Sequence, residues 1–116
     1  MTISQAAALL GGTLICGEKN VDKTLSSACG ADLMSDVLAF AKEGGVLLTG
    51  MVNPHVIRTA EMLDVQCIVF VRGKKPADDV VSLARQTGVT LLTCDYTLYE
   101  ACGRLFAEGL PPCRKV

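Results

Sequence analysis

One stretch of this chain, residues 45–73, constrains the fold most strongly because its pattern is that of a complete strand, helix and strand. Apolar residues 46–48 are followed by Asn53 and Pro54, a capping residue and then a proline at a first helical position. Apolar residues next recur at helical spacing, and residues 67–71 form a continuous apolar run typical of a strand buried on both faces. Two strands joined in this way are parallel, with a right-handed crossover.

The segments on either side repeat this alternation. Helices are expected in residues 2–10, 32–42, 76–87 and 95–108, and extended segments in residues 13–16, 21–28 and 89–93. Asp32 and Asp95 are placed as N-caps of their helices, and residues 29–31 are expected to break the preceding extended segment. The predicted fold is α/β: one domain, residues 1–110, with a mostly parallel sheet of about five strands flanked by helices. Residues 111–116 are expected to form a C-terminal tail that is frayed over residues 113–116.

Composition indicates an aliphatic core and an apolar surface that a second copy of the chain covers. Half of the 116 residues are hydrophobic and only 4% are aromatic, so the core must be built from Leu, Val, Ile and Ala. The mean hydropathy of +0.39 is high for a small domain, which leaves apolar surface that the chain cannot bury internally. The sequence therefore predicts a homodimer.

The net charge of −1 excludes two classes of partner. Lys and Arg are scattered, without the basic patch that nucleic acids or anionic membranes require. The apolar runs are strand-sized and far shorter than the roughly 20 residues needed to span a bilayer. No basic segment precedes the apolar residues near the start, so a secretory signal is not expected and the predicted location is the cytoplasm.

Loop residues after the predicted strands suggest a ligand site. Parallel strands bring their carboxyl ends to one edge, where ligands bind in open α/β sheets and where helix N-termini favour anions. The candidate ligand-binding residues at this edge are Thr49, Gly50, Asn53, His55, Arg72, Gly73, Lys74 and Asp95. We expect a small anionic or nucleotide-like ligand there. Ordinary loops with solvated charges remain the alternative interpretation.

The sequence offers little for catalysis. His55 has no partner at a spacing that would form a triad or an acid/base pair, and a histidine in the first turn of a helix is more often a surface residue. The strings G-x-G-x-x-G, G-x-x-x-x-G-K-[ST], G-x-S-x-G and H-E-x-x-H are absent. No independent catalytic activity is expected.

Six cysteines leave one further possibility. There is no C-x-x-C and only one histidine, so ordinary zinc patterns are absent and free thiols are expected. If Cys29 and Cys94 approach one another at the strand ends, Cys102 lies two helical turns further on, and the three thiols could hold an iron–sulfur cluster. Small buried core residues are the simpler interpretation of these cysteines, with no cofactor.

The strings GGVLLTG, CIVFVRGKKPADDVVSLARQTGVTLL and ACGRLF together resemble the DRTGG domain, most strongly over residues 46–106. The second half is also similar to the amino-terminal domain of HPr kinase/phosphorylase. Thr49 and Gly50 match the Thr-Gly-Gly of the family and Met51 replaces its second glycine, while Asp32 lies in the region of the family's Asp-Arg without an arginine after it. The resemblance implies a non-catalytic α/β module that is regulatory or dimer-forming.

The segment CGADLMSDVLAF, residues 29–40, resembles the sequences of stand-alone chains encoded beside iron-only hydrogenases. Such chains are often labelled as iron–sulfur-binding. This resemblance implies the alternative function, an iron–sulfur-binding accessory protein with a hydrogenase-related partner.

Overall fold

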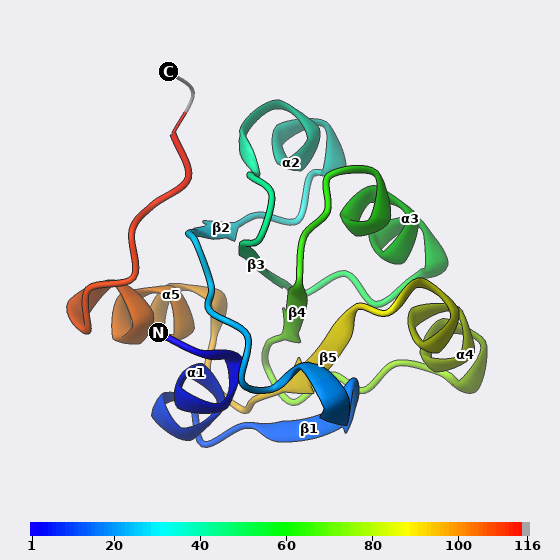
Figure 1. Ribbon diagram of the computed structural model, residues 1–116, viewed down its shortest axis with the longest axis horizontal. Helices are drawn as coiled ribbons and strands as arrows, with labels where there is room; N and C mark the ends of the chain where they lie inside the picture. Colours follow the sequence, from blue (N-terminus) through cyan, green and yellow to red (C-terminus); the bar gives the residue numbers. More distant parts are fainter. Residues whose placement is uncertain (115–116) are drawn as a thin grey trace.

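A computed structural model describes residues 1–114 and contains one five-stranded sheet with helices on both faces (Figure 1). The elements in chain order are α1 (Ile3–Leu9), β1 (Thr13–Cys16), the 3-10 helix η1 (Glu18–Asn20), β2 (Ala28–Gly30), α2 (Met34–Phe40), β3 (Val46–Thr49), α3 (Pro54–Met62), β4 (Cys67–Phe70), α4 (Asp78–Thr87), β5 (Thr90–Thr93) and α5 (Leu98–Ala107). The predicted α/β fold is confirmed.

The order of strands in the sheet is β1-β5-β4-β3-β2. Strands β2 to β5 are parallel, and β1 pairs with β5 in the antiparallel sense at one edge. The mostly parallel sheet of about five strands is therefore as expected. Because β2 to β5 run in one direction, their carboxyl ends lie at the same edge, which we call the carboxyl edge; the end of the sheet where these four strands begin is called the opposite edge.

Helices α2, α3 and α4 cover one face of the sheet, and α1 and α5 cover the other (Figure 1). Alternate strand residues feed the two cores: Leu47 packs toward α3, and Leu48 packs toward α5. Strands β3, β4 and β5 are buried along their whole length, which explains why their residues are apolar except for threonines at strand ends. Each such aliphatic side chain contributes about 1.5–3 kcal/mol by leaving water. None of the helices within residues 1–114 is long and apolar enough to cross a membrane.

Two of the predicted helix caps are wrong. Asn53 caps α3 as expected, accepting a hydrogen bond from the backbone N–H of Val56 at 3.2 Å. The N-cap of α2, however, is Leu33 rather than Asp32, and α2 has no side-chain cap. The N-cap of α5 is Thr97 rather than Asp95. A carboxylate before a helix can also accept hydrogen bonds from other nearby donors. Asp32 accepts one from the N–H of Gly50, just beyond β3, instead of capping α2.

The edge strand β2 differs most from the sequence-based expectation. Most of residues 21–27 are irregular, and Cys29 belongs to β2 rather than interrupting a strand. Ala28 donates its N–H to Pro111 O at 2.9 Å and accepts from Cys113 N at 3.0 Å. The expectation of a frayed tail is therefore wrong for Cys113, because an edge strand offers unpaired backbone groups that the tail satisfies. Residues 115–116 of the predicted tail lie outside the described residues.

Candidate functional site

The loops that follow β3, β4 and β5 are tied together at the carboxyl edge. Lys74, in the loop after β4, donates its Nζ to the carbonyl oxygen of Gly50 at 3.0 Å. The carbonyl oxygen of Lys74 in turn accepts a hydrogen bond from Thr93 Oγ1 at 2.8 Å. The structure thus brings the predicted residues Gly50 and Lys74 into contact, and the end of β5 fixes the loop that carries Lys74.

The turn formed by Thr49 and Gly50, here called the Thr-Gly turn, is held by a carboxylate from the loop after β2. Asp32 Oδ1 accepts hydrogen bonds from Gly50 N at 2.7 Å and from Thr49 Oγ1 at 3.0 Å. Thr49 Oγ1 also accepts from Met51 N at 3.1 Å. Sequence reasoning missed this role of Asp32. The available signal was an acidic residue just beyond β2, beside the Thr-Gly that ends the adjacent strand.

Arg72 brings a guanidinium group to the same turn. Arg72 and Gly73 both have left-handed backbones, with φ of +60° and +67°. Their N–H groups donate to Tyr96 O and Cys94 O, each at 2.8 Å, so the loop after β5 fixes this conformation. Arg72 Nη2 lies only 2.7 Å from the point where a side chain on Gly50 would begin. Glycine at position 50 therefore leaves the space that the guanidinium occupies.

The carboxyl edge carries positive charge that the protein does not neutralise by ion pairing. Within residues 1–114, the ion pairs are Arg58 with Glu61 and Arg104 with Glu100, and neither involves Arg72 or Lys74. Arg72 and Lys74 are thus cations at the Thr-Gly turn without a carboxylate in ion-pair contact. A planar guanidinium and an ammonium close together suit a phosphate or carboxylate group.

The remaining predicted site residues lie around this centre. The Asn53 side chain is used in capping α3. His55 is exposed in the first turn of α3. Asp95 is exposed, and its Oδ1 lies 3.2 Å from the point where a side chain on Gly73 would begin. The structure therefore places Asp95 beside Gly73, at the rim of the edge.

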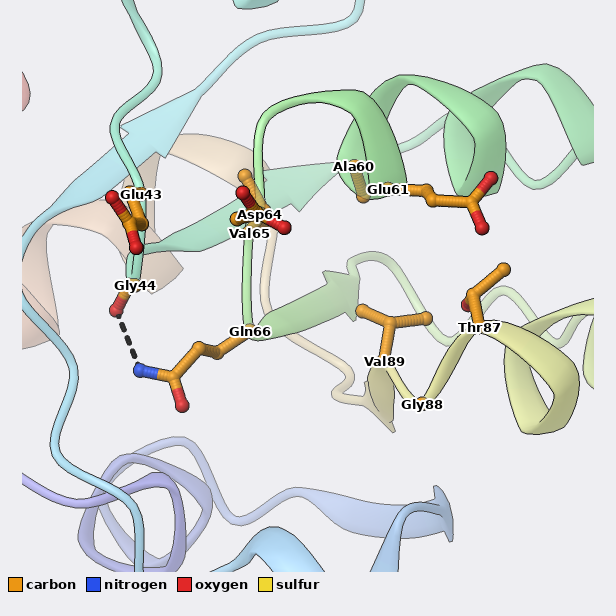
Figure 2. Close-up of a pocket in the computed structure, with 10 residues that line it drawn as sticks. All are labelled: Glu43, Gly44, Ala60, Glu61, Asp64, Val65, Gln66, Thr87, Gly88 and Val89. Carbon is orange, nitrogen blue, oxygen red and sulfur yellow. Dashed lines mark hydrogen bonds between the residues drawn. The ribbon is translucent and has the colours of Figure 1, made fainter.

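A cavity of about 440 Å³ lies at the opposite edge (Figure 2). It is lined by Glu43, Gly44, Ala60, Glu61, Asp64, Val65, Gln66, Thr87, Gly88 and Val89. Gln66 donates its Nε2 to Gly44 O at 3.1 Å, as Figure 2 shows. Three carboxylates and the C-terminal ends of α3 and α4 make this cavity negative, so it is unsuited to an anionic ligand. The sequence did not predict it.

The three thiols of the iron–sulfur alternative are divided between the two faces of the sheet. Cys29 packs on the face of α3, whereas Cys94 and Cys102 pack on the face of α5. Within residues 1–114, no three His, Cys, Asp or Glu side chains are close enough to hold a metal ion. These side chains therefore do not fit a cluster bound by one chain.

Burial also disfavours the thiolate form of these cysteines. It raises the pKa of the Cys94 and Cys102 thiols, and it raises the pKa of Cys29 to about 12, with the nearby Cys113 thiol adding to the effect. A thiol must lose its proton to act as a nucleophile or a metal ligand. Cys29 and Cys94 are buried, and Cys102 is half-buried against the core on the face of α5.

Comparison with known proteins identifies the family. A profile of the DRTGG domain matches residues 5–107. This chain belongs to the DRTGG domain family. It is similar in structure to the CBS and DRTGG domains of the regulatory region of Clostridium perfringens pyrophosphatase, complexed with the activator diadenosine tetraphosphate. The TM-score is 0.75 at 17% identity, and the match covers 95% of this chain and 47% of that chain, which supports a shared fold. No curated protein matches this chain.

The residues that resemble the two parts of the family motif meet in this DRTGG domain. Thr49 and Gly50 resemble the Thr-Gly of the motif, and Asp32, from the segment that resembles the Asp-Arg region, accepts hydrogen bonds from both. Leu33 follows Asp32, so no arginine stands next to this aspartate, yet the guanidinium of Arg72 reaches Gly50 from the loop after β4. The carboxylate, the turn and a guanidinium are thus assembled at one place.

Proposed function

We propose that this DRTGG domain is a regulatory module that binds a small anionic or nucleotide-like ligand at its carboxyl edge and has no catalytic activity of its own. The observation that carries the proposal is the pair of cations, Arg72 and Lys74, beside the Thr-Gly turn without a carboxylate in ion-pair contact. Charge-assisted hydrogen bonds from such groups are the strong ones in phosphate recognition.

Two further facts support this ligand class. The edge lies beyond the carboxyl ends of parallel strands, where open α/β sheets bind ligands. The solved structure to which this chain is similar contains an adenosine polyphosphate as the activator of that pyrophosphatase. Adenosine phosphates are therefore the first compounds to test.

The test is isothermal titration of the protein with AMP, ATP, diadenosine tetraphosphate and pyrophosphate. We expect heat with at least one polyphosphate, and an affinity about tenfold lower in Arg72→Gln because a charged hydrogen bond is lost. Arg58→Gln is the matched control, since Arg58 is an exposed arginine that pairs with Glu61 away from the site. The control should bind within about twofold of wild type. Absence of heat with all four compounds would contradict the proposal.

We also propose that the domain forms a homodimer through the outer face of α5. Tyr99 and Phe106 are 91% and 66% exposed, and both flank Gly103, around which the surface is open. Hollows of about 410 and 480 Å³ lie on the two sides of the line formed by Tyr99, Gly103 and Phe106. Tyr99 and Gly103 line both hollows. Projecting aromatic rings and hollows on the same helix can fit each other across a two-fold axis.

Sedimentation tests the dimer. The wild-type protein should be a dimer at micromolar concentration, and the double substitution Tyr99→Ser with Phe106→Ser should make it monomeric by removing the apolar contact. Met62→Ser is the control, because Met62 is an apolar residue that is 74% exposed on α3, outside the proposed interface. This variant should remain a dimer. A monomeric wild type at that concentration would refute the dimer.

A further inference from the structure

We propose that the Thr-Gly turn is a binding site for a phosphoryl group, and that in this structure the Asp32 carboxylate occupies it. Ligand binding then exchanges one anion for another: a phosphoryl oxygen takes the place of Asp32 Oδ1, and the Asp32 side chain leaves. This inference rests on the proposed function, and it adds how the site is regulated.

The first support is the convergence of donors on a single oxygen atom. Gly50 N and Thr49 Oγ1 both donate to Asp32 Oδ1, at 2.7 Å and 3.0 Å. A backbone N–H and a hydroxyl aimed at one anionic oxygen are what a phosphoryl oxygen requires. Asp32 itself is exposed, so it can leave the turn without opening the core.

The second support is that the single negative charge of Asp32 lies near two cations, Arg72 and Lys74. Arg72 Nη2 and Asp32 Oδ1 lie 2.7 Å and 3.5 Å from the point where a side chain on Gly50 would begin, yet the two groups form no ion pair within residues 1–114. Lys74 adds a second cation at Gly50 O. A phosphoryl group carries more negative charge than a carboxylate and has several oxygens, so it can contact both cations and the turn together.

Release of Asp32 also frees the segment that leads into α2. This helix has seven residues, has no side-chain cap, and buries only Met34 and Val37. Phe40, at its last residue, is 45% exposed. Its start is held to β3 by Asp32 and by the N–H of Ala31, which donates to Leu48 O at 3.1 Å. The exchange of anions would therefore loosen residues 31–40, which converts ligand binding into a change at the surface of α2.

The first test compares two substitutions by titration with pyrophosphate. Asp32→Asn removes the competing charge while keeping the size of the side chain, so it should bind pyrophosphate about tenfold more tightly than wild type. Asp36→Asn removes an equal charge from the first turn of α2 without a hydrogen bond to the Thr-Gly turn. It should bind within about twofold of wild type. An Asp32→Asn protein that binds no more tightly than Asp36→Asn overturns the inference.

The second test needs no substitution and decides the question if Asp32→Asn does not fold. Saturating pyrophosphate should increase hydrogen exchange of the wild-type amides in residues 31–40. Unchanged or slower exchange there overturns the inference. If the wild type binds pyrophosphate through Arg72 but neither effect is seen, the exchange of anions is refuted and the proposed function stands. If pyrophosphate and the adenosine phosphates all fail to bind, both proposals are refuted.

Discussion

The two edges of the sheet differ in shape and in charge, and the features that suggest a ligand site are divided between them. The opposite edge has a cavity of about 440 Å³, but its walls carry Glu43, Glu61 and Asp64 (Figure 2). The carboxyl edge presents Arg72 and Lys74 around the Thr-Gly turn. At about 4 Å and an effective dielectric constant near 20, each charge contributes about 4 kcal/mol of attraction or repulsion before solvation is counted. For an anionic ligand, the sign of the charge therefore outweighs the volume of the cavity.

The largest expected effect comes from reversing the charge at the carboxyl edge. Arg72→Glu should lower the affinity for pyrophosphate by about a hundredfold or more, because attraction is replaced by repulsion. Arg58→Glu makes the same change of charge near the opposite edge and should lower it by less than about threefold. Titration calorimetry measures both. Equal losses in the two variants would show that the overall charge matters and that the carboxyl edge does not.

A smaller effect is expected from adding one methyl group at the turn. In Gly50→Ala the new carbon would lie 2.7 Å from Arg72 Nη2, so the guanidinium must move, and pyrophosphate affinity should fall about tenfold. Unfolding stability should change by less than about 1 kcal/mol, since the displaced atom ends a flexible side chain. Gly103→Ala is the control for affinity, because nothing lies within 4 Å of the added carbon and Gly103 lies on the proposed dimer face of α5 rather than at the Thr-Gly turn. Undiminished binding in Gly50→Ala would argue against the position of Arg72 as a determinant.

The smallest effect is expected at the opposite edge. The double substitution Glu61→Gln with Asp64→Asn removes two of the three cavity carboxylates, and pyrophosphate affinity should change by no more than about twofold. The effect is small because the two edges lie at opposite ends of the strands, and salt screens the interaction between charges at that separation. A gain of about tenfold or more would mean that the cavity, once its negative charge is reduced, competes for the anion, and the comparison between the edges would fail.

The sequence predicted those parts of this comparison that depend on local pattern. Asn53 and Pro54 mark the start of α3, and the apolar runs of β3 and β4 mark buried parallel strands, because caps and burial leave a signature within a few residues. The carboxyl edge followed from the direction of those strands. Its residues Gly50 and Lys74 are indeed in contact.

The contacts across the edge could not be predicted in the same way. An aspartate before a helix has the same local pattern whether it caps that helix or, like Asp32, bonds to a turn 17 residues later. The position of Arg72 over Gly50 depends on a left-handed backbone that hydrogen bonds to Tyr96 and Cys94 impose. The cavity at the opposite edge depends on how several loops pack, which no short pattern records.

The most direct measurement is a map of amide chemical-shift changes on titration of the labelled protein with pyrophosphate. Ligand binding at the carboxyl edge predicts the largest changes in residues 31–40, 49–53, 71–75 and 94–97, with small changes in residues 43–44, 60–66 and 87–89. Changes concentrated in the second set, around the cavity of the opposite edge, would contradict the account.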